Sequence, residues 1–268
     1  MMVRDCKILD ELPHGGQKSV YLASHPEYGK VVVKKGKITS FTSLERIKRE
    51  VELLSELDSK YFPKQYHFNI DLKTQEFEIV EDYIEGVVLR EQMTHTKSTN
   101  EIFGLLQKLI KGLSIIWDKN VVHRDLKPEN IIIRPNGEPC IIDLGIARFL
   151  DLESLTKTIS PFGPCTPIYA APEQLTNNKN QIDPRTDFFS LGIIALELYL
   201  GVHPFSLECV GGKFSIVENI MQNNYSTNCK MTNSCVEIEE FALKTLQTQS
   251  YNRFRNYRLF NDFIKKYL

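Results

Sequence analysis

The segment that most constrains this chain is DFFSLGIIALELYL, residues 187–200, which as a helix is apolar on every side. A helix without a polar face has to be surrounded by other elements, so we expect it at the centre of a helical core. The segment is too short to span a bilayer, and it contains Glu197. Gly201 follows directly and predicts the end of the helix.

The first third of the chain has a different pattern. Residues 20–23 and 31–34 are β-branched and aromatic runs joined by a Pro/Gly turn, which predicts two strands. Residues 42–57 change to helical spacing, and residues 77–84 predict another strand. The remainder is mostly helical, as in residues 100–117. A small sheet-rich half followed by a larger helical half predicts an α+β fold with a seam between the halves, where ligands are commonly bound.

Charge and cysteine content exclude several classes of protein. The net charge of the 268 residues is −1, so no strong field draws the chain to nucleic acid or to an anionic membrane. None of the six cysteines forms a C-x-x-C pair, which argues against zinc and thioredoxin-like sites. Residues 1–16 lack the apolar core of a signal peptide. We expect a reduced, cytoplasmic protein without a membrane segment, and nothing in the sequence specifies its oligomeric state.

The strongest chemical signal is HRDLKPEN, residues 123–130. Phosphoryl transfer depends mainly on positioning and charge compensation. Here Asp125 can orient an attacking hydroxyl, Lys127 supplies a cation, and Asn130 offers an amide oxygen that suits Mg²⁺. The run resembles the catalytic loop of the eukaryotic-like, or Hanks-type, protein kinases, and its Lys-Pro-Glu filling resembles their Ser/Thr branch. The alternative is a charged loop without function, and eight ordered matching positions argue against it.

A second motif follows at the spacing of that family. Residues 141–145, IIDLG, resemble the D-F-G metal motif, with Leu144 in place of Phe. The resemblance implies that Asp143 holds Mg²⁺ (or Mn²⁺) against the phosphates of ATP. Leu144 keeps an apolar side chain at its position, so we do not expect the substitution to be disabling. Alone, D-L-G is a common turn, and it gains weight only from following the catalytic loop.

The strand at residues 31–34 resembles the V-A-I-K strand of the same family. The resemblance implies that Lys34 contacts the α- and β-phosphates and that Val32 lies over the adenine. Lys35 is the competing lysine, but strand alternation places it on the opposite face. Glu50 borders the apolar face of the helix at 42–57 and resembles the glutamate that pairs with this lysine.

The glycine-rich loop departs most from the family pattern. Residues 12–20 align with L-G-x-G-x-x-G-x-V, but Pro13 replaces the first glycine and Lys18 the third. The resemblance assigns Gly15, Gly16 and Val20 to ATP binding. Backbone amides approach phosphates best where no Cβ intrudes, so the loop should still cover the nucleotide, with altered geometry.

Residues 81–84 resemble the hinge that holds adenine in this family. Backbone groups of Asp82 and Ile84 would hydrogen-bond the base, and Glu81 falls at the gatekeeper position. An alignment shifted by one residue would put Val80 there instead. Ile132, in the strand-like run after the catalytic loop, belongs to the same predicted set of ATP-binding residues.

Residues 165–173, CTPIYAAPE, resemble G-T-P-x-Y-x-A-P-E. The resemblance implies that Thr166 touches Asp125 and Lys127 and favours hydroxyl over phenol substrates. It pairs Glu173 with a distant arginine, for which Arg253 is the first choice and Arg255 the second. Asp187 resembles the aspartate that braces the catalytic loop from the central helix. Cys165 in place of Gly is most simply a tolerated substitution, with a redox role as the alternative.

Arg124 lies beside the expected catalytic base, and its charge needs a partner. In kinases with this arrangement, a phosphorylated residue of the activation loop supplies that partner. Thr156 and Thr158 are the favoured acceptors between Gly145 and Thr166.

Together the motifs predict a single bilobal protein-kinase domain over residues 1–268, with an N-lobe at about 1–85 and a C-lobe at about 86–268. The resemblance implies MgATP in the cleft and a protein substrate with a Ser or Thr acceptor. The sequence is of a type common in bacteria. Two alternatives stay open: a pseudokinase scaffold, suggested by the irregular glycine loop, and a small-molecule kinase of the aminoglycoside type, which lacks the Lys-Pro-Glu filling and the A-P-E segment.

Overall fold

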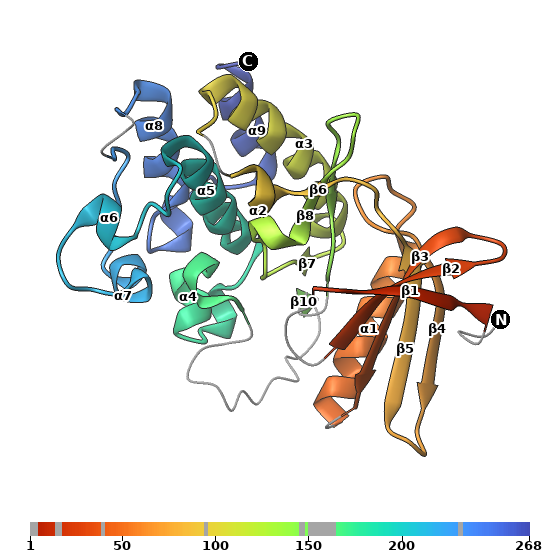
Figure 1. Cartoon of the computed structure of the whole chain (residues 1–268). Coiled ribbons are helices and arrows are strands. Elements are labelled where there is room, and N and C mark those ends of the chain that lie inside the picture. Colours follow the sequence, from red (N-terminus) through yellow and green to blue (C-terminus); the bar gives the residue numbers. More distant parts are fainter. Residues whose placement is uncertain are drawn as a thin grey trace. The chain divides into compact units, whose positions relative to one another are not determined.

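The computed structural model describes residues 5–13, 18–38, 41–93, 96–144, 148–149, 165–229 and 233–268 (Figure 1). The chain forms two compact units, Met1–Gly86 and Val87–Leu268. Most described strand residues belong to the first unit and most helical residues to the second. The predicted α+β organisation is therefore confirmed.

The first unit is built on a five-stranded antiparallel sheet with strand order β1-β2-β3-β5-β4. Its strands are β1 (Lys7–Leu12), β2 (Lys18–His25), β3 (Gly29–Lys37), β4 (Gln65–Asp71) and β5 (Glu76–Asp82). The turn from β2 to β3 is closed by the His25 Nδ1, which accepts the Glu27 N–H at 3.1 Å, and Gly29 supplies a positive φ of 71°. The strands predicted at 20–23 and 31–34 are confirmed, and the strand predicted at 77–84 is present but ends earlier, at Asp82.

The two faces of this sheet carry different apolar clusters. On one face Ala23, Val31, Val33 and Val80 pack together. On the other, Phe77 and Ile79 pack with Ile38 and with Ile47 of helix α1 (Phe41–Glu56). Strand alternation therefore places successive residues of β3 in two environments.

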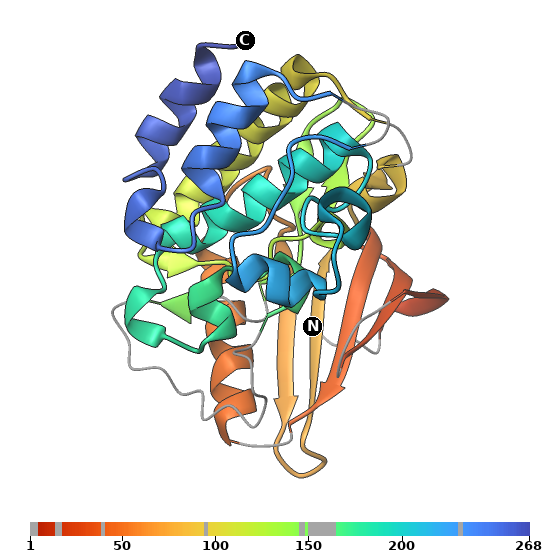
Figure 2. The ribbon, with the colours of Figure 1, turned by 90° about the vertical axis from the view of Figure 1, so that its left-hand side faces the viewer.

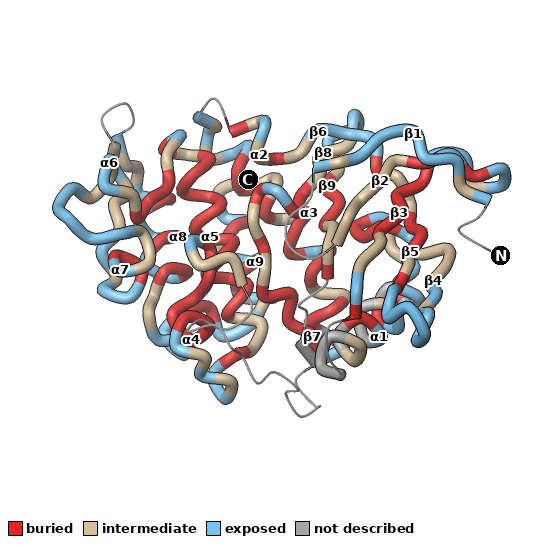
Figure 3. Tube along the Cα trace, turned by 60° about the horizontal axis from the view of Figure 1, so that its bottom comes forward, coloured by how far each residue is buried: buried red, intermediate tan, exposed pale blue. Residues whose placement is uncertain are grey.

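The second unit is organised around α5 (Pro184–Leu200), which is buried along almost its whole length (Figure 3). Asp183 caps its start by accepting the Arg185 N–H, and Gly201 ends it with a φ of 72°. Gly192 allows close packing against α8 (Val236–Thr245), since a Cβ there would lie 2.6 Å from the Thr245 hydroxyl oxygen. The prediction of a buried central helix is confirmed, with an earlier start.

Helices α3 (Thr99–Trp117) and α8 pack against α5, and α9 (Tyr257–Lys265) lies beside α3 (Figure 2). Aromatic rings from three of these helices meet: the Phe188 ring of α5 lies 5.1 Å from Trp117 of α3 and 5.1 Å from Phe260 of α9 between ring centroids. The shorter helices are α2 (Leu89–Gln92), α4 (Pro172–Leu175), α6 (Leu207–Val210) and α7 (Ile216–Met221). Within the described residues, no helix combines the length and apolarity needed to cross a membrane.

The second unit also contains short strands and 3₁₀ turns between its helices. A three-stranded sheet has the order β6 (Val87–Val88), β8 (Ile131–Ile133), β9 (Pro139–Ile141), and β7 (Val121–Val122) pairs with β10 (Arg148–Phe149). The 3₁₀ turns are η2 (Pro128–Asn130), η3 (Pro167–Tyr169), η4 (Lys179–Gln181) and η5 (Ser250–Asn252). The segment 123–127 thus lies between β7 and η2, and Asp143 follows β9.

Candidate active site

Asp125 is the centre of a hydrogen-bonded triangle. Its Oδ1 accepts the Thr166 N–H at 2.9 Å and the Thr166 hydroxyl at 2.7 Å. Its Oδ2 lies 3.1 Å from the Lys127 Nζ, which also donates to the Thr166 hydroxyl oxygen at 2.8 Å. The contacts expected of Thr166 are present. The arrangement holds a carboxylate, a cation and a hydroxyl together in a half-buried position, where their interaction is stronger than in bulk water.

Asp187 holds the backbone of residues 123 and 124 from α5. Its Oδ1 accepts the Arg124 N–H at 2.9 Å, and its Oδ2 accepts the His123 N–H at 2.9 Å. The Trp117 indole N–H also donates to Oδ2, at 2.8 Å, a contact that sequence reasoning missed. Burial raises the pKa of Asp187, although these donors favour its charged form. Asp187 therefore lies on the central helix and contacts the backbone of residues 123 and 124, as the family resemblance implied.

The loop also has an unusual backbone. Arg124 has a φ of 71° and Asp143 a φ of 64°, values that are uncommon for residues with a side chain. The Gln174 side-chain amide donates to the Arg124 carbonyl at 2.8 Å and supports the strained residue. Backbone strain of this kind concentrates at functional sites.

Asn130 and Asp143 offer oxygen ligands from neighbouring positions. The Ile142 N–H donates to the Asn130 carbonyl at 2.9 Å, which fixes the two segments side by side. The Asn130 amide nitrogen donates to the Asp125 carbonyl at 2.9 Å, so the oxygen of the same amide is the atom that can ligate a cation. Within the described residues no group of three or more His, Cys, Asp or Glu could hold a metal by itself. Two protein oxygens fit Mg²⁺, which commonly takes its remaining ligands from phosphate and water.

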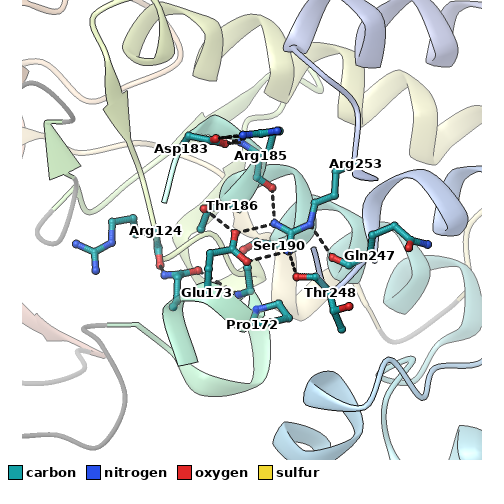
Figure 4. Close-up of polar contacts among 12 residues, drawn as sticks. Arg124, Pro172, Glu173, Asp183, Arg185, Thr186, Ser190, Gln247, Thr248 and Arg253 are labelled. Atoms are coloured by element: carbon teal, nitrogen blue, oxygen red, sulfur yellow. Dashed lines mark hydrogen bonds and ion pairs between the residues drawn. The ribbon is translucent and has the colours of Figure 1, made fainter. Parts of the chain in front are cut away.

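A buried ion pair fixes the segment that follows Thr166 (Figure 4). The Arg253 guanidinium donates to Glu173 Oε1 at 2.7 Å and Oε2 at 2.8 Å, and both side chains are almost fully buried. The Thr186 hydroxyl also donates to Glu173 Oε1 at 2.8 Å. The expected partner Arg253 makes this contact, whereas Arg255 is exposed.

The sequence analysis did not predict a second cluster of charged side chains, which is centred on Arg90. The Arg90 guanidinium contacts Glu129 Oε1 at 2.7 Å and Glu197 Oε1 at 2.8 Å. The Tyr169 hydroxyl donates to Glu197 and also contacts Arg90, and burial raises the pKa of that phenol. The signal that could have found it is Glu197 itself, because a carboxylate in an apolar helix requires a partner.

Cys165 directly precedes Thr166, which contacts Asp125 and Lys127. Burial raises the pKa of its thiol to about 11, with a smaller opposing effect from Arg124. The group is therefore a neutral thiol near pH 7, which favours the tolerated substitution over a redox role.

In the first unit, Lys34 pairs with Glu81. The Lys34 Nζ lies 2.6 Å from Glu81 Oε1, and both residues are buried. Glu81 is directly opposite Val32 in the β3–β5 register, while Val80 belongs to the cluster on the other face. Glu50 belongs to α1, but its side chain lies outside the described part of the structure.

The strand end at Asp82 is anchored by side-chain contacts. The Asp82 N–H donates to the Lys64 carbonyl at 2.9 Å. Its carboxylate accepts the Lys64 N–H at 3.1 Å and the Tyr66 hydroxyl. Burial, followed by this hydrogen bond to Asp82, raises the pKa of Tyr66 to about 12.

The remaining predicted residues are distributed as follows. Val20 lies opposite Lys34 in the β2–β3 register, Ile84 is buried, and Ile132 lies in β8 opposite Val88. The predicted residues outside the described part of the structure are Gly15, Gly16, Thr156 and Thr158.

Comparison with known proteins gives a consistent result. The family model described as "Protein kinase domain" matches residues 6–264. The chain is 31% identical over 212 residues to "Probable serine/threonine-protein kinase pknA2" of Bifidobacterium longum, which covers 74% of this chain and 27% of that protein. It is 32% identical over 209 residues to serine/threonine-protein kinase pkn2 of Myxococcus xanthus, covering 74% of this chain and 25% of the relative.

A nematode relative gives a similar match. Serine/threonine-protein kinase cst-1 of Caenorhabditis elegans is 31% identical over 202 residues, covering 74% of this chain and 39% of the relative. The chain thus spans well under half the length of these curated relatives. The resemblance to the Hanks-type kinases is confirmed.

Proposed function

This chain belongs to the protein kinase family, and from that premise we propose that it transfers the γ-phosphoryl group of MgATP to Ser or Thr hydroxyls of proteins. The observation that carries the proposal is the triangle of Asp125, Thr166 and Lys127, in which Asp125 Oδ1 accepts the Thr166 hydroxyl at 2.7 Å and Oδ2 lies 3.1 Å from the Lys127 Nζ. A carboxylate that accepts one aliphatic hydroxyl in this position is suited to accept another from a substrate.

Each residue of the triangle has a proposed part in the reaction. Asp125 orients the acceptor hydroxyl and takes up its proton as the hydroxyl oxygen bonds to the γ-phosphorus, while the bond from that phosphorus to the bridging oxygen breaks and ADP leaves. Lys127 compensates the charge on the transferred group. Thr166 keeps Asp125 in place and favours an aliphatic hydroxyl over a phenol.

The phosphates are proposed to be held by Lys34, with Glu50 as its helical partner. Asn130 and Asp143 are the proposed metal ligands, and Mg²⁺ (or Mn²⁺) bound there would neutralise phosphate charge. Asp187 and the Glu173–Arg253 pair are proposed to have structural parts. Asp187 connects the backbone of residue 124 to α5, and the ion pair connects α4 to the segment after η5.

The adenine is proposed to bind at the end of β5. The Asp82 carbonyl and the Ile84 N–H would hydrogen-bond the base, and Val20, Val32 and Ile132 would supply apolar contacts. Gly15 and Gly16 would cover the phosphates from the glycine-rich loop.

We further propose that the chain phosphorylates itself at Thr156 or Thr158. The support is the sequence, in which Arg124 adjoins Asp125 and phosphate is a strong partner for a guanidinium. Mass spectrometry of the protein expressed alone should find phosphate on one of these threonines, and the Asp125→Asn variant should lack it. Full activity of protein without phosphate between residues 146 and 165 would contradict this switch while leaving the kinase assignment intact.

The principal test is transfer of label from γ-labelled ATP to a generic basic protein. The wild-type chain should yield phosphoserine or phosphothreonine, and Lys34→Met should abolish the transfer. ATP binding without transfer would establish the pseudokinase alternative instead. Transfer to an aminoglycoside but to no protein would establish the small-molecule kinase alternative.

We also propose a reducing, cytoplasmic location for this chain. The free thiols of all six cysteines support this location.

A further inference from the structure

We propose that Glu81 competes with the phosphates of the nucleotide for the Lys34 ammonium and thereby weakens the binding of phosphorylated nucleotides. The inference rests on the proposed function, in which Lys34 contacts those phosphates. Glu81 would be a further residue that determines the affinity for phosphorylated nucleotides. It belongs to strand β5, whereas Glu50, the proposed partner of Lys34, belongs to helix α1.

The geometry of the pair is set by two neighbouring strands. Glu81 on β5 lies opposite Val32, and Lys34 lies opposite Ile79, so the two charged residues stand diagonally on one face of the sheet. The Lys34 Nζ is 2.6 Å from Glu81 Oε1. The backbone ladder between β3 and β5 places the two residues at neighbouring positions on this face.

Burial makes this contact strong. The side chains of Lys34 and Glu81 are 8% and 4% exposed, so little water screens their charges. A buried charge is retained only when it is paired, and separating such a pair is costly. A phosphate that draws the Lys34 ammonium toward itself therefore has to work against Glu81.

The same two strands hold a second lysine–glutamate pair, Lys35 and Glu78, on their other face. The Lys35 Nζ lies 2.9 Å from Glu78 Oε1, but these side chains are 42% and 29% exposed. The Lys35–Glu78 pair thus has the same chemistry and a similar distance in a solvated setting. It provides the matched control, because exposed pairs of this kind have little effect on energy.

Charge balance gives the direction of the effect. Lys34 and Glu81 together are neutral, and the incoming phosphates meet a cation whose charge is already compensated. Glu81→Gln keeps the size of the side chain and an oxygen for the ammonium, but it removes the negative charge. The affinity for ADP should then rise by at least about tenfold, because little water screens the repulsion between the Glu81 carboxylate and the phosphates in this buried site.

Adenosine separates this effect from a general change of the pocket. It carries the same base and ribose but no phosphate, so its affinity should be unchanged in Glu81→Gln. The quantity to be measured is the ratio of the ADP and adenosine dissociation constants, without divalent metal, by calorimetry on the full chain.

The expected result is an ADP preference at least about tenfold greater in Glu81→Gln than in wild type, and an unchanged ratio in Glu78→Gln. Lys34→Met should lower the ADP affinity. If Lys34→Met leaves ADP binding unaltered, the phosphate-contacting part proposed for Lys34 fails, and this inference fails with it. If Lys34→Met weakens ADP binding but Glu81→Gln leaves the ratio unaltered, only the inference about Glu81 is overturned.

A second variant keeps the test decisive if Glu81→Gln does not fold. Glu81→Asp retains the charge and shortens the side chain by one methylene, which withdraws the carboxylate from Lys34. It should shift the ratio in the same direction by a smaller factor, and a ratio equal to that of wild type would overturn the proposal.

Discussion

Replacing Arg253 by Met should strongly destabilise the unit formed by residues 87–268. The guanidinium donates to both oxygens of Glu173, and also to the carbonyls of Arg185 at 3.0 Å and Gln247 at 2.8 Å. Arg253→Met fills a similar volume but removes all of these donors. The Glu173 carboxylate would remain buried, with the Thr186 hydroxyl at 2.8 Å as its remaining side-chain donor in Figure 4.

The magnitude follows from leaving a buried charge without its counterion. Breaking one partner of such a pair costs about 3–5 kcal/mol. For a unit of this size, each kcal/mol lowers the melting temperature by about 2–4 °C, so Arg253→Met should melt about 6–20 °C below wild type. Removing the stranded charge as well, in Arg253→Met/Glu173→Leu, should recover at least half of the loss, since apolar replacement of a buried pair is often nearly neutral.

The assay is denaturant and thermal unfolding followed by circular dichroism. The control is Asp262→Asn, which breaks the exposed pair in which the Lys265 Nζ lies 3.6 Å from Asp262 Oδ1. That change should stay within about 0.5 kcal/mol of wild type. If Arg253→Met lost no more than Asp262→Asn, or if the double variant were the least stable of the series, the reasoning about the buried pair would be refuted.

Three further predictions concern other sites. Asp143→Asn should raise the Mg²⁺ concentration needed for half-maximal activity, because a charged hard ligand becomes neutral, and an unchanged Mg²⁺ titration would contradict the metal assignment. Burial lowers the pKa of His203, whose neutral Nδ1 accepts the Phe205 N–H at 3.3 Å. The unfolded chain therefore takes up the proton first, and the free energy of unfolding should fall as the pH drops below about 6.5. His203→Gln should reduce this pH dependence, and a wild-type stability that does not change with pH in this range would contradict the prediction. Arg90→Gln should cost about 1–2 kcal/mol because Glu197 loses a charged partner, and unaltered unfolding would show that the Tyr169 hydroxyl suffices.

Patterns within one element carried most of the fold prediction. The central helix was predictable because residues 187–200 have no polar face, which leaves burial as the stable arrangement. The strands at 20–23 and 31–34 were predictable from β-branched content and from the turn between them. The start of the helix at Pro184 was missed, since the cap at Asp183 lies outside the apolar run.

Contacts between distant elements were harder to predict. The pairing of Lys34 with Glu81 depends on the register between β3 and β5, and the sequence does not specify which residues of two strands stand opposite each other. Arg90 and Glu197 are far apart in sequence and meet only through the packing of α2 near α5. Resemblance to a family supplied Asp187 and Arg253, but not the Trp117 indole that shares the Asp187 carboxylate.

The assignment of Asp125 as the catalytic base can be tested by comparing Asp125→Asn with wild type. ATP affinity and unfolding should be close to wild type, because the amide keeps the shape of the carboxylate. Phosphoryl transfer to a protein acceptor should fall by at least about 100-fold, the usual contribution of a positioned general base. A folded, pure Asp125→Asn protein that transfers phosphate at the wild-type rate would contradict the account.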